Sequence, residues 1–94
     1  KGTEYHESFH FVFNHLLPKE QQDAMLNDVR SREGSFEDRA SGKTVNYADA
    51  TDLQIEEKLA DDFADFRLGK IKVSSIVHEV IKSYNVLIFS FLLN

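Results

Sequence analysis

The sequence predicts a mainly α-helical fold, and three observations support this. Apolar residues recur at spacings of three and four over several stretches, which is the period of a helix that packs one face against a core. Thr51-Asp-Leu-Gln54 fits a capping box at a helix start, and Gly69 stands where the same helix would need a residue in the left-handed conformation as its C-terminal cap. A chain of 94 residues can build one small core. We therefore expect a single small helical domain.

Two helices are predicted in the first third of the chain. The first runs from about Thr3 to Leu17, and its apolar positions are Phe9, Val12, Phe13, Leu16 and Leu17. Phe11 should point away from this face. Pro18 suits the first turn of a second helix, where its missing N–H costs nothing. The second helix continues to about Arg32 through the apolar residues Ala24, Met25, Leu26 and Val29.

The rest of the chain is predicted to contain a loop and two more helices. Residues 33–50 are rich in turn formers and show no sustained period, which indicates a loop that includes a short extended piece at Thr44 to Tyr47. The third helix should start at the capping box and end near Leu68, and its apolar positions are Leu53, Leu59, Ala60, Phe63 and Phe66. The period over residues 73–92 predicts a fourth helix, with a strand at residues 86–91 as the alternative.

Composition excludes several kinds of function. The net charge of -5 argues against nucleic-acid binding, which relies on clustered Lys and Arg. The chain has no cysteine, so disulfides and thiolate metal sites are excluded and any metal must bind to imidazole and carboxylate. The apolar run at the end of the chain is too short to cross a bilayer, so no transmembrane span is expected.

The residues with the clearest chemistry form an H-E-x-x-H motif, His6-Glu7-Ser8-Phe9-His10. On a helix this spacing puts both imidazoles on one face, within reach of one metal ion. A catalytic zinc usually has three protein ligands, so a third is expected on a facing helix. Glu57 on the third helix can supply it, and Asp61, four residues later, can accept the remaining ring N–H of a ligand histidine.

Glu56 is the alternative third ligand, and only one of these two adjacent glutamates is expected to face the first helix. The non-functional alternatives are a pair of surface histidines and a solvated acidic helix face. In that case the motif is accidental and the domain is purely structural.

These motifs resemble zincin metallopeptidases of the glutamate-ligand type, in which a helix with E-x-x-[SA]-[DN] follows the histidines. The stretch E-K-L-A-D-D-F-A is particularly similar to the ImmA/IrrE-like group. The pattern HESFHFVFNHLL, then a helix starting LPKEQQ, then EEKLADDFADF also resembles metallopeptidase-like domains in large multi-domain proteins of bacteriophages and mobile elements. The resemblance covers about Tyr5 to Phe66.

The resemblance implies a zinc-dependent metallopeptidase that acts on a protein or peptide. It implies His6, His10 and Glu57 as zinc ligands, Glu7 as general base, and Asp61 as the carboxylate that orients a ligand histidine. The alternative is a catalytically silent zincin-like module used for binding. Three side chains are candidates for stabilising an oxyanion by their chemistry alone, namely His15, Tyr47 and His78.

The resemblance also implies a domain organisation. Residues 1–69 would form a partial zincin-like core, and residues 70–94 an amphipathic C-terminal helix or a linker to a following module. The helices would then be a fragment of an α+β domain whose sheet precedes Lys1, within a larger parent polypeptide. A phage-encoded or phage-associated protein of this kind is expected in the cytoplasm of a bacterial host.

Overall fold

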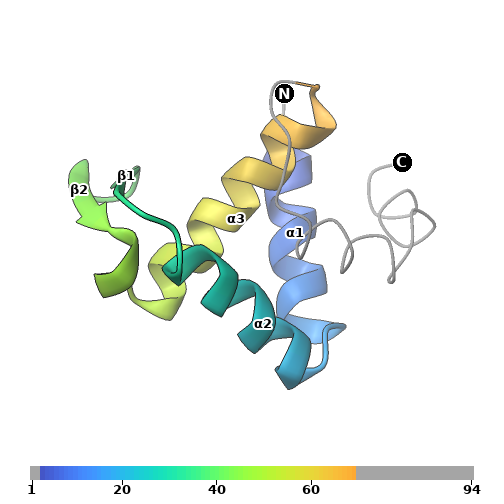
Figure 1. Cartoon of the computed structure of the whole chain (residues 1–94). Helices are drawn as coiled ribbons and strands as arrows, with labels where there is room; N and C mark the ends of the chain where they lie inside the picture. The colour runs from blue at the N-terminus through green and yellow to red at the C-terminus, as the bar shows by residue number, and fades with distance from the viewer. Residues whose placement is uncertain (1–2, 70–94) are drawn as a thin grey trace.

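In the computed structural model of the chain, which describes residues 3–69, three α-helices surround one core (Figure 1). The helices are α1 (Thr3–His15), α2 (Lys19–Arg30) and α3 (Asp52–Arg67). A hairpin of β1 (Ser35–Asp38) and β2 (Lys43–Asn46) and a short 3-10 helix (Tyr47–Asp49) connect α2 to α3. Helices α1 and α3 lie side by side and run in opposite directions, while the hairpin lies on the other side of α3 (Figure 1). The predicted mainly helical class is confirmed.

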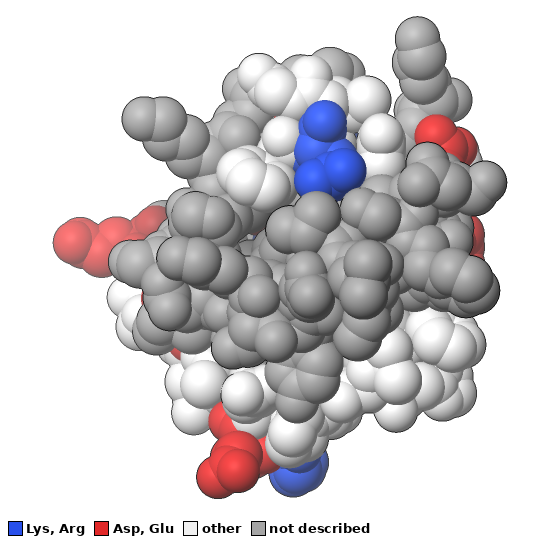
Figure 2. All heavy atoms as spheres, turned by 90° about the vertical axis from the view of Figure 1, so that its right-hand side faces the viewer, with Lys and Arg blue, Asp and Glu red and all other residues white. Residues whose placement is uncertain are grey.

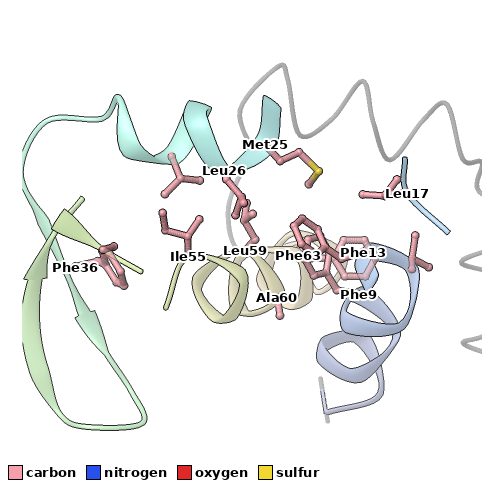
Figure 3. Close-up of a cluster of buried hydrophobic side chains, with 13 residues drawn as sticks. Phe9, Phe13, Leu17, Met25, Leu26, Phe36, Ile55, Leu59, Ala60 and Phe63 are labelled. Atoms are coloured by element: carbon pink, nitrogen blue, oxygen red, sulfur yellow. The ribbon is translucent and has the colours of Figure 1, made fainter. Parts of the chain in front are cut away.

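Buried aromatic rings join α1 to α3. The ring of Phe9 lies 5.7 Å from that of Phe13 and 5.8 Å from that of Phe63, measured between centroids. Helix α2 closes this core with Met25 and Leu26 (Figure 3). Rings of this size contribute most of the burial energy in a small core, so they fix how α1 sits on α3.

The buried stripe of α3 differs from the predicted one at its start. Leu53 is 66% exposed, whereas Ile55 is fully buried together with Leu59 and Phe63. The last three residues follow one another at intervals of four and so share one helix face, and Leu53, two residues before Ile55, points to the opposite side. Leu16 is also exposed rather than buried, and Phe11 is exposed as predicted.

The predicted loop at residues 33–50 is largely a β-hairpin. The extended piece expected near Thr44 corresponds to β2, which pairs antiparallel with β1 so that Phe36 is opposite Val45. The buried carboxylate of Asp38 accepts hydrogen bonds from the backbone N–H of Ala40 and the hydroxyl of Ser41, which closes the turn between the strands.

Both predicted ends of α3 are confirmed. The Thr51 hydroxyl accepts from the N–H of Gln54 at 3.1 Å, and the Gln54 side chain accepts from the N–H of Thr51 at 2.9 Å. At the other end Gly69 has a φ of 77°, the left-handed conformation that favours glycine. The start of α3 is also tied to α2, because Arg30 donates to the carbonyl of Ala50. These contacts fix where α3 begins and ends.

The predicted fourth helix, its strand alternative and the proposed unit at residues 70–94 lie outside the described residues. None of the helices between residues 3 and 69 has the length and apolar character needed to cross a membrane. On the face drawn in Figure 2, the acidic side chains of the described residues lie along the outline and the basic ones stand apart from one another.

Candidate metal centre

The two histidines of the H-E-x-x-H motif lie together at the contact between α1 and α3. Their ring centroids are 4.8 Å apart, and the two Nε2 atoms are 3.1 Å apart. The spacing of four residues places them one above the other on the helix, beside the buried stripe that contains Phe9 and Phe13. His6 and His10 are half-buried, so this face is neither core nor open surface.

Glu57 on α3 faces both Nε2 atoms. One carboxylate oxygen, Oε1, lies 3.1 Å from His6 Nε2, and the other, Oε2, lies 3.2 Å from His10 Nε2. The ligand atoms of the three residues all lie within 4.8 Å of one another. The structure therefore brings together the three residues predicted from the sequence, and this group can hold a metal ion.

The other nitrogen of each imidazole faces a further carboxylate of α3. His6 Nδ1 lies 2.9 Å from Asp61 Oδ1, and His10 Nδ1 lies 2.5 Å from Glu56 Oε2. The contact of Asp61 with a histidine is as predicted. The expectation that only one of the adjacent glutamates faces α1 is wrong, because the long side chains of Glu56 and Glu57 reach opposite nitrogens of the same His10 ring.

This arrangement fits a bound cation. An ionised carboxylate only accepts hydrogen bonds, so each Nδ1 donates its proton to Asp61 or Glu56, and a neutral ring then presents a lone pair at Nε2. The two Nε2 atoms and the carboxylate of Glu57 then converge on one position. A tetrahedral zinc ion with Zn–N distances of about 2.0–2.1 Å would separate its two nitrogens by about 3.3 Å. The observed 3.1 Å is close to this separation.

The same carboxylates change the proton affinity of His10. Burial lowers its pKa, but the hydrogen bond to Glu56 and the negative charges of Glu57 and Glu56 outweigh burial, so the pKa lies above the ordinary 6.5. The metal-free ring of His10 therefore takes up a proton more readily than a free imidazole does. Metal and proton compete for this ring, so metal affinity should fall as the pH is lowered.

Glu7, the predicted general base, is exposed and follows His6 directly. Its carboxylate makes no hydrogen bond or ion pair with any other residue in the described range 3–69. Consecutive helical residues are separated by about 100° around the axis, so Glu7 lies beside the histidine face rather than on it. Its carboxylate is thus available to a molecule that approaches the centre from solvent.

The candidates for oxyanion stabilisation are not brought to the centre. His15 packs against the ring of Phe11 at the end of α1, with 5.0 Å between centroids. Tyr47 packs on Phe36 next to the hairpin. His78 lies outside the described residues.

Two residues near the centre were not anticipated from the sequence. Asn14 donates to Glu56 Oε2 at 2.7 Å, and its place four residues after His10 on the same helix was a signal that could have identified it. The second is Arg39, in the hairpin, whose Nη1 atom lies 3.5 Å from Asp61 Oδ1. Nothing local in the sequence relates Arg39 to α3, because their proximity arises from the fold of the hairpin.

A cleft open to solvent borders the centre on the hairpin side. It lies between β1, the turn after it and α3. Arg39, Glu57, Lys58 and Asp61 are among the residues that line it. One glutamate, Glu57, therefore faces both the cleft and the two histidines.

Comparison of the chain with protein-family models, with curated proteins and with solved structures finds no significant match. The resemblance to zincins therefore depends on the quoted motifs and on the side-chain geometry around His6, His10 and Glu57.

Proposed function

We propose that the chain is a zinc-dependent metallopeptidase domain in which His6, His10 and Glu57 hold the metal and Glu7 is the general base. The observation that carries this proposal is the convergence of two imidazole Nε2 atoms and one carboxylate, with an exposed glutamate beside them. Imidazole and carboxylate ligands suit zinc, and three protein ligands leave a fourth position open, as in catalytic zinc sites.

When bound, zinc would supply a Lewis acid that activates water and polarises the carbonyl of a peptide bond. A carboxylate oxygen of Glu7 takes a proton from the attacking water, whose oxygen forms a bond to the carbonyl carbon. The C–N bond then breaks, and Glu7 delivers the proton to the nitrogen of the leaving amine. Asp61 and Glu56 hold the two rings in place through their Nδ1 atoms.

The substrate proposed is a protein or peptide, because Glu7 is exposed and the cleft beside Glu57 is open to solvent. The cleft beside Glu57 gives such a chain a surface to contact next to the proposed metal ligands. Arg39 and Lys58 on its wall can hydrogen-bond to backbone carbonyl groups of such a chain.

The test is to compare Glu7→Gln with wild type on a denatured protein substrate at matched zinc occupancy. We expect the variant to bind zinc normally and to lose activity on the order of 10²- to 10⁴-fold, about 3–5 kcal/mol of barrier. Glu20→Gln is the matched control, because it changes an exposed glutamate on α2 in the same way.

Activity of Glu7→Gln equal to that of the wild type would contradict the mechanism. Zinc binding with no turnover in wild type would instead favour the second candidate, a silent binding module. The feature compatible with that candidate is that Glu7 has no partner among residues 3–69 that fixes its orientation.

A further inference from the structure

Glu56 occupies a more constrained place at the centre than a solvated acidic residue would. Its side chain is only 12% exposed, and its Oε2 atom accepts from two donors on α1. One donor is His10 Nδ1 at 2.5 Å, and the other is the side-chain amide of Asn14 at 2.7 Å. Asn14 Nδ2 also donates to the backbone carbonyl of His10 at 2.9 Å, so the amide holds Glu56 against the helix turn that carries His10.

The contact of Asp61 with His6 is weaker than that of Glu56 with His10, because it is longer and because Asp61 also faces a cation. Asp61 Oδ1 is 2.9 Å from His6 Nδ1, and the same oxygen lies 3.5 Å from Arg39 Nη1. Arg39 therefore neutralises part of the charge that Asp61 presents to His6. The second donor to Glu56 is the neutral amide of Asn14, which leaves the full negative charge facing His10.

We infer that Glu56, held by Asn14, is a positioning residue that keeps the proton of His10 on Nδ1 and directs the Nε2 lone pair at the metal. The inference rests on the proposed metal centre and extends it, because the zincin-like pattern assigns an orienting carboxylate to Asp61 alone. A carboxylate on the outer nitrogen fixes the tautomer of a ligand histidine and increases its basicity. His10 is thus the more strongly preorganised of the two histidines.

The experiment compares Glu56→Gln, Asp61→Asn and the control Asp65→Asn in the whole chain. Asp65→Asn removes the same charge from the same helix without touching either histidine. Zinc affinity is measured by competition with a chromophoric chelator, and folding by circular dichroism. Nitrogen-15 correlation spectra of the metal-free protein, recorded where the rings are neutral, show which nitrogen of His10 carries the proton.

We expect Glu56→Gln to lower zinc affinity on the order of 10- to 100-fold with the helices intact, and Asp61→Asn to lower it less. Asp65→Asn should bind zinc as wild type does. In the metal-free wild type the proton of His10 should be on Nδ1, and in Glu56→Gln it should be distributed over both nitrogens, because a glutamine amide can donate as well as accept.

Zinc affinity of Glu56→Gln equal to that of the control, or an unchanged His10 tautomer, would overturn the inference. The two proposals can fail separately. If wild type binds no zinc, the proposed function fails, while the tautomer of metal-free His10 still decides whether Glu56 positions this ring.

Discussion

Replacing Glu57 by glutamine should weaken the metal centre more than any change in its surroundings. Each carboxylate oxygen of Glu57 faces one Nε2 atom, at 3.1 and 3.2 Å, so the substitution removes the only charge directed at the metal position by the predicted ligands. Loss of a carboxylate that only orients a ligand costs on the order of 10- to 100-fold in metal affinity. Loss of a ligand itself should therefore cost at least about 100-fold, or about 2.7 kcal/mol.

This loss of zinc affinity can be measured as a smaller zinc-induced rise in Tm. Zinc at about 1,000 times its Kd stabilises the folded state by about 4.1 kcal/mol, and a 100-fold weaker site at the same concentration gains only about 1.4 kcal/mol. For a domain of this size, 1 kcal/mol corresponds to about 4–8 °C in Tm. The zinc-induced rise should thus fall from about 16–33 °C in wild type to about 6–11 °C in Glu57→Gln.

The assay is a pair of melting curves for each protein, with zinc and with chelator. The side chain of Glu57 is 42% exposed, so the variant should fold normally without metal. Glu37→Gln is the control, because Glu37 lines the same cleft without facing an Nε2 atom. An equal zinc-induced rise in Glu57→Gln and wild type would refute the reasoning that Glu57 is a ligand.

Three further predictions concern His10, the core and the cap of α3. Because the pKa of His10 is above 6.5 in the folded state, its stabilisation of the metal-free protein is fully present below pH 6.5 and is lost as the pH rises through the folded pKa. Urea denaturation across this range should show the decline in wild type and His15→Gln but not in His10→Gln, and an identical decline in His10→Gln would exclude this cause. Phe63→Ala should destabilise the fold by about 3–5 kcal/mol, since it removes a fully buried ring between α1 and α3; a much smaller loss of unfolding free energy would show that the ring does not join these helices. Thr51→Ala should cost about 1 kcal/mol by removing the cap of α3, and unchanged denaturation would argue against the capping box.

The parts of the fold that could be predicted are those with local causes. The capping box at Thr51 and the left-handed Gly69 depend on hydrogen bonds and backbone geometry within a few residues, so the sequence alone identified both ends of α3. Strand β1 was missed because Glu37 and Asp38 have low strand propensity. Its pairing depends on β2 and on the burial of Phe36 instead.

The candidate site also has a part that could be predicted from local sequence and a part that could not. The spacing of His6 and His10 predicts one shared face, and the motif on α3 placed Glu57 opposite them. Which nitrogen each carboxylate reaches depends on how closely α1 packs on α3. The sequence does not contain that distance, so the contact of Glu56 with His10 and the position of Arg39 could not be predicted.

The most direct test of the proposed centre is a titration of the metal-free chain with cobalt(II) at neutral pH, followed by visible absorption and by metal analysis after zinc loading. The visible absorption of bound cobalt(II) depends on its coordination geometry, whereas zinc, a d¹⁰ ion, gives no such absorption. We predict about one metal ion per molecule and the absorption of a four-coordinate site with two imidazoles and one carboxylate, both abolished in His10→Gln. Metal binding near zero in a chain whose helices are intact by circular dichroism would contradict the account.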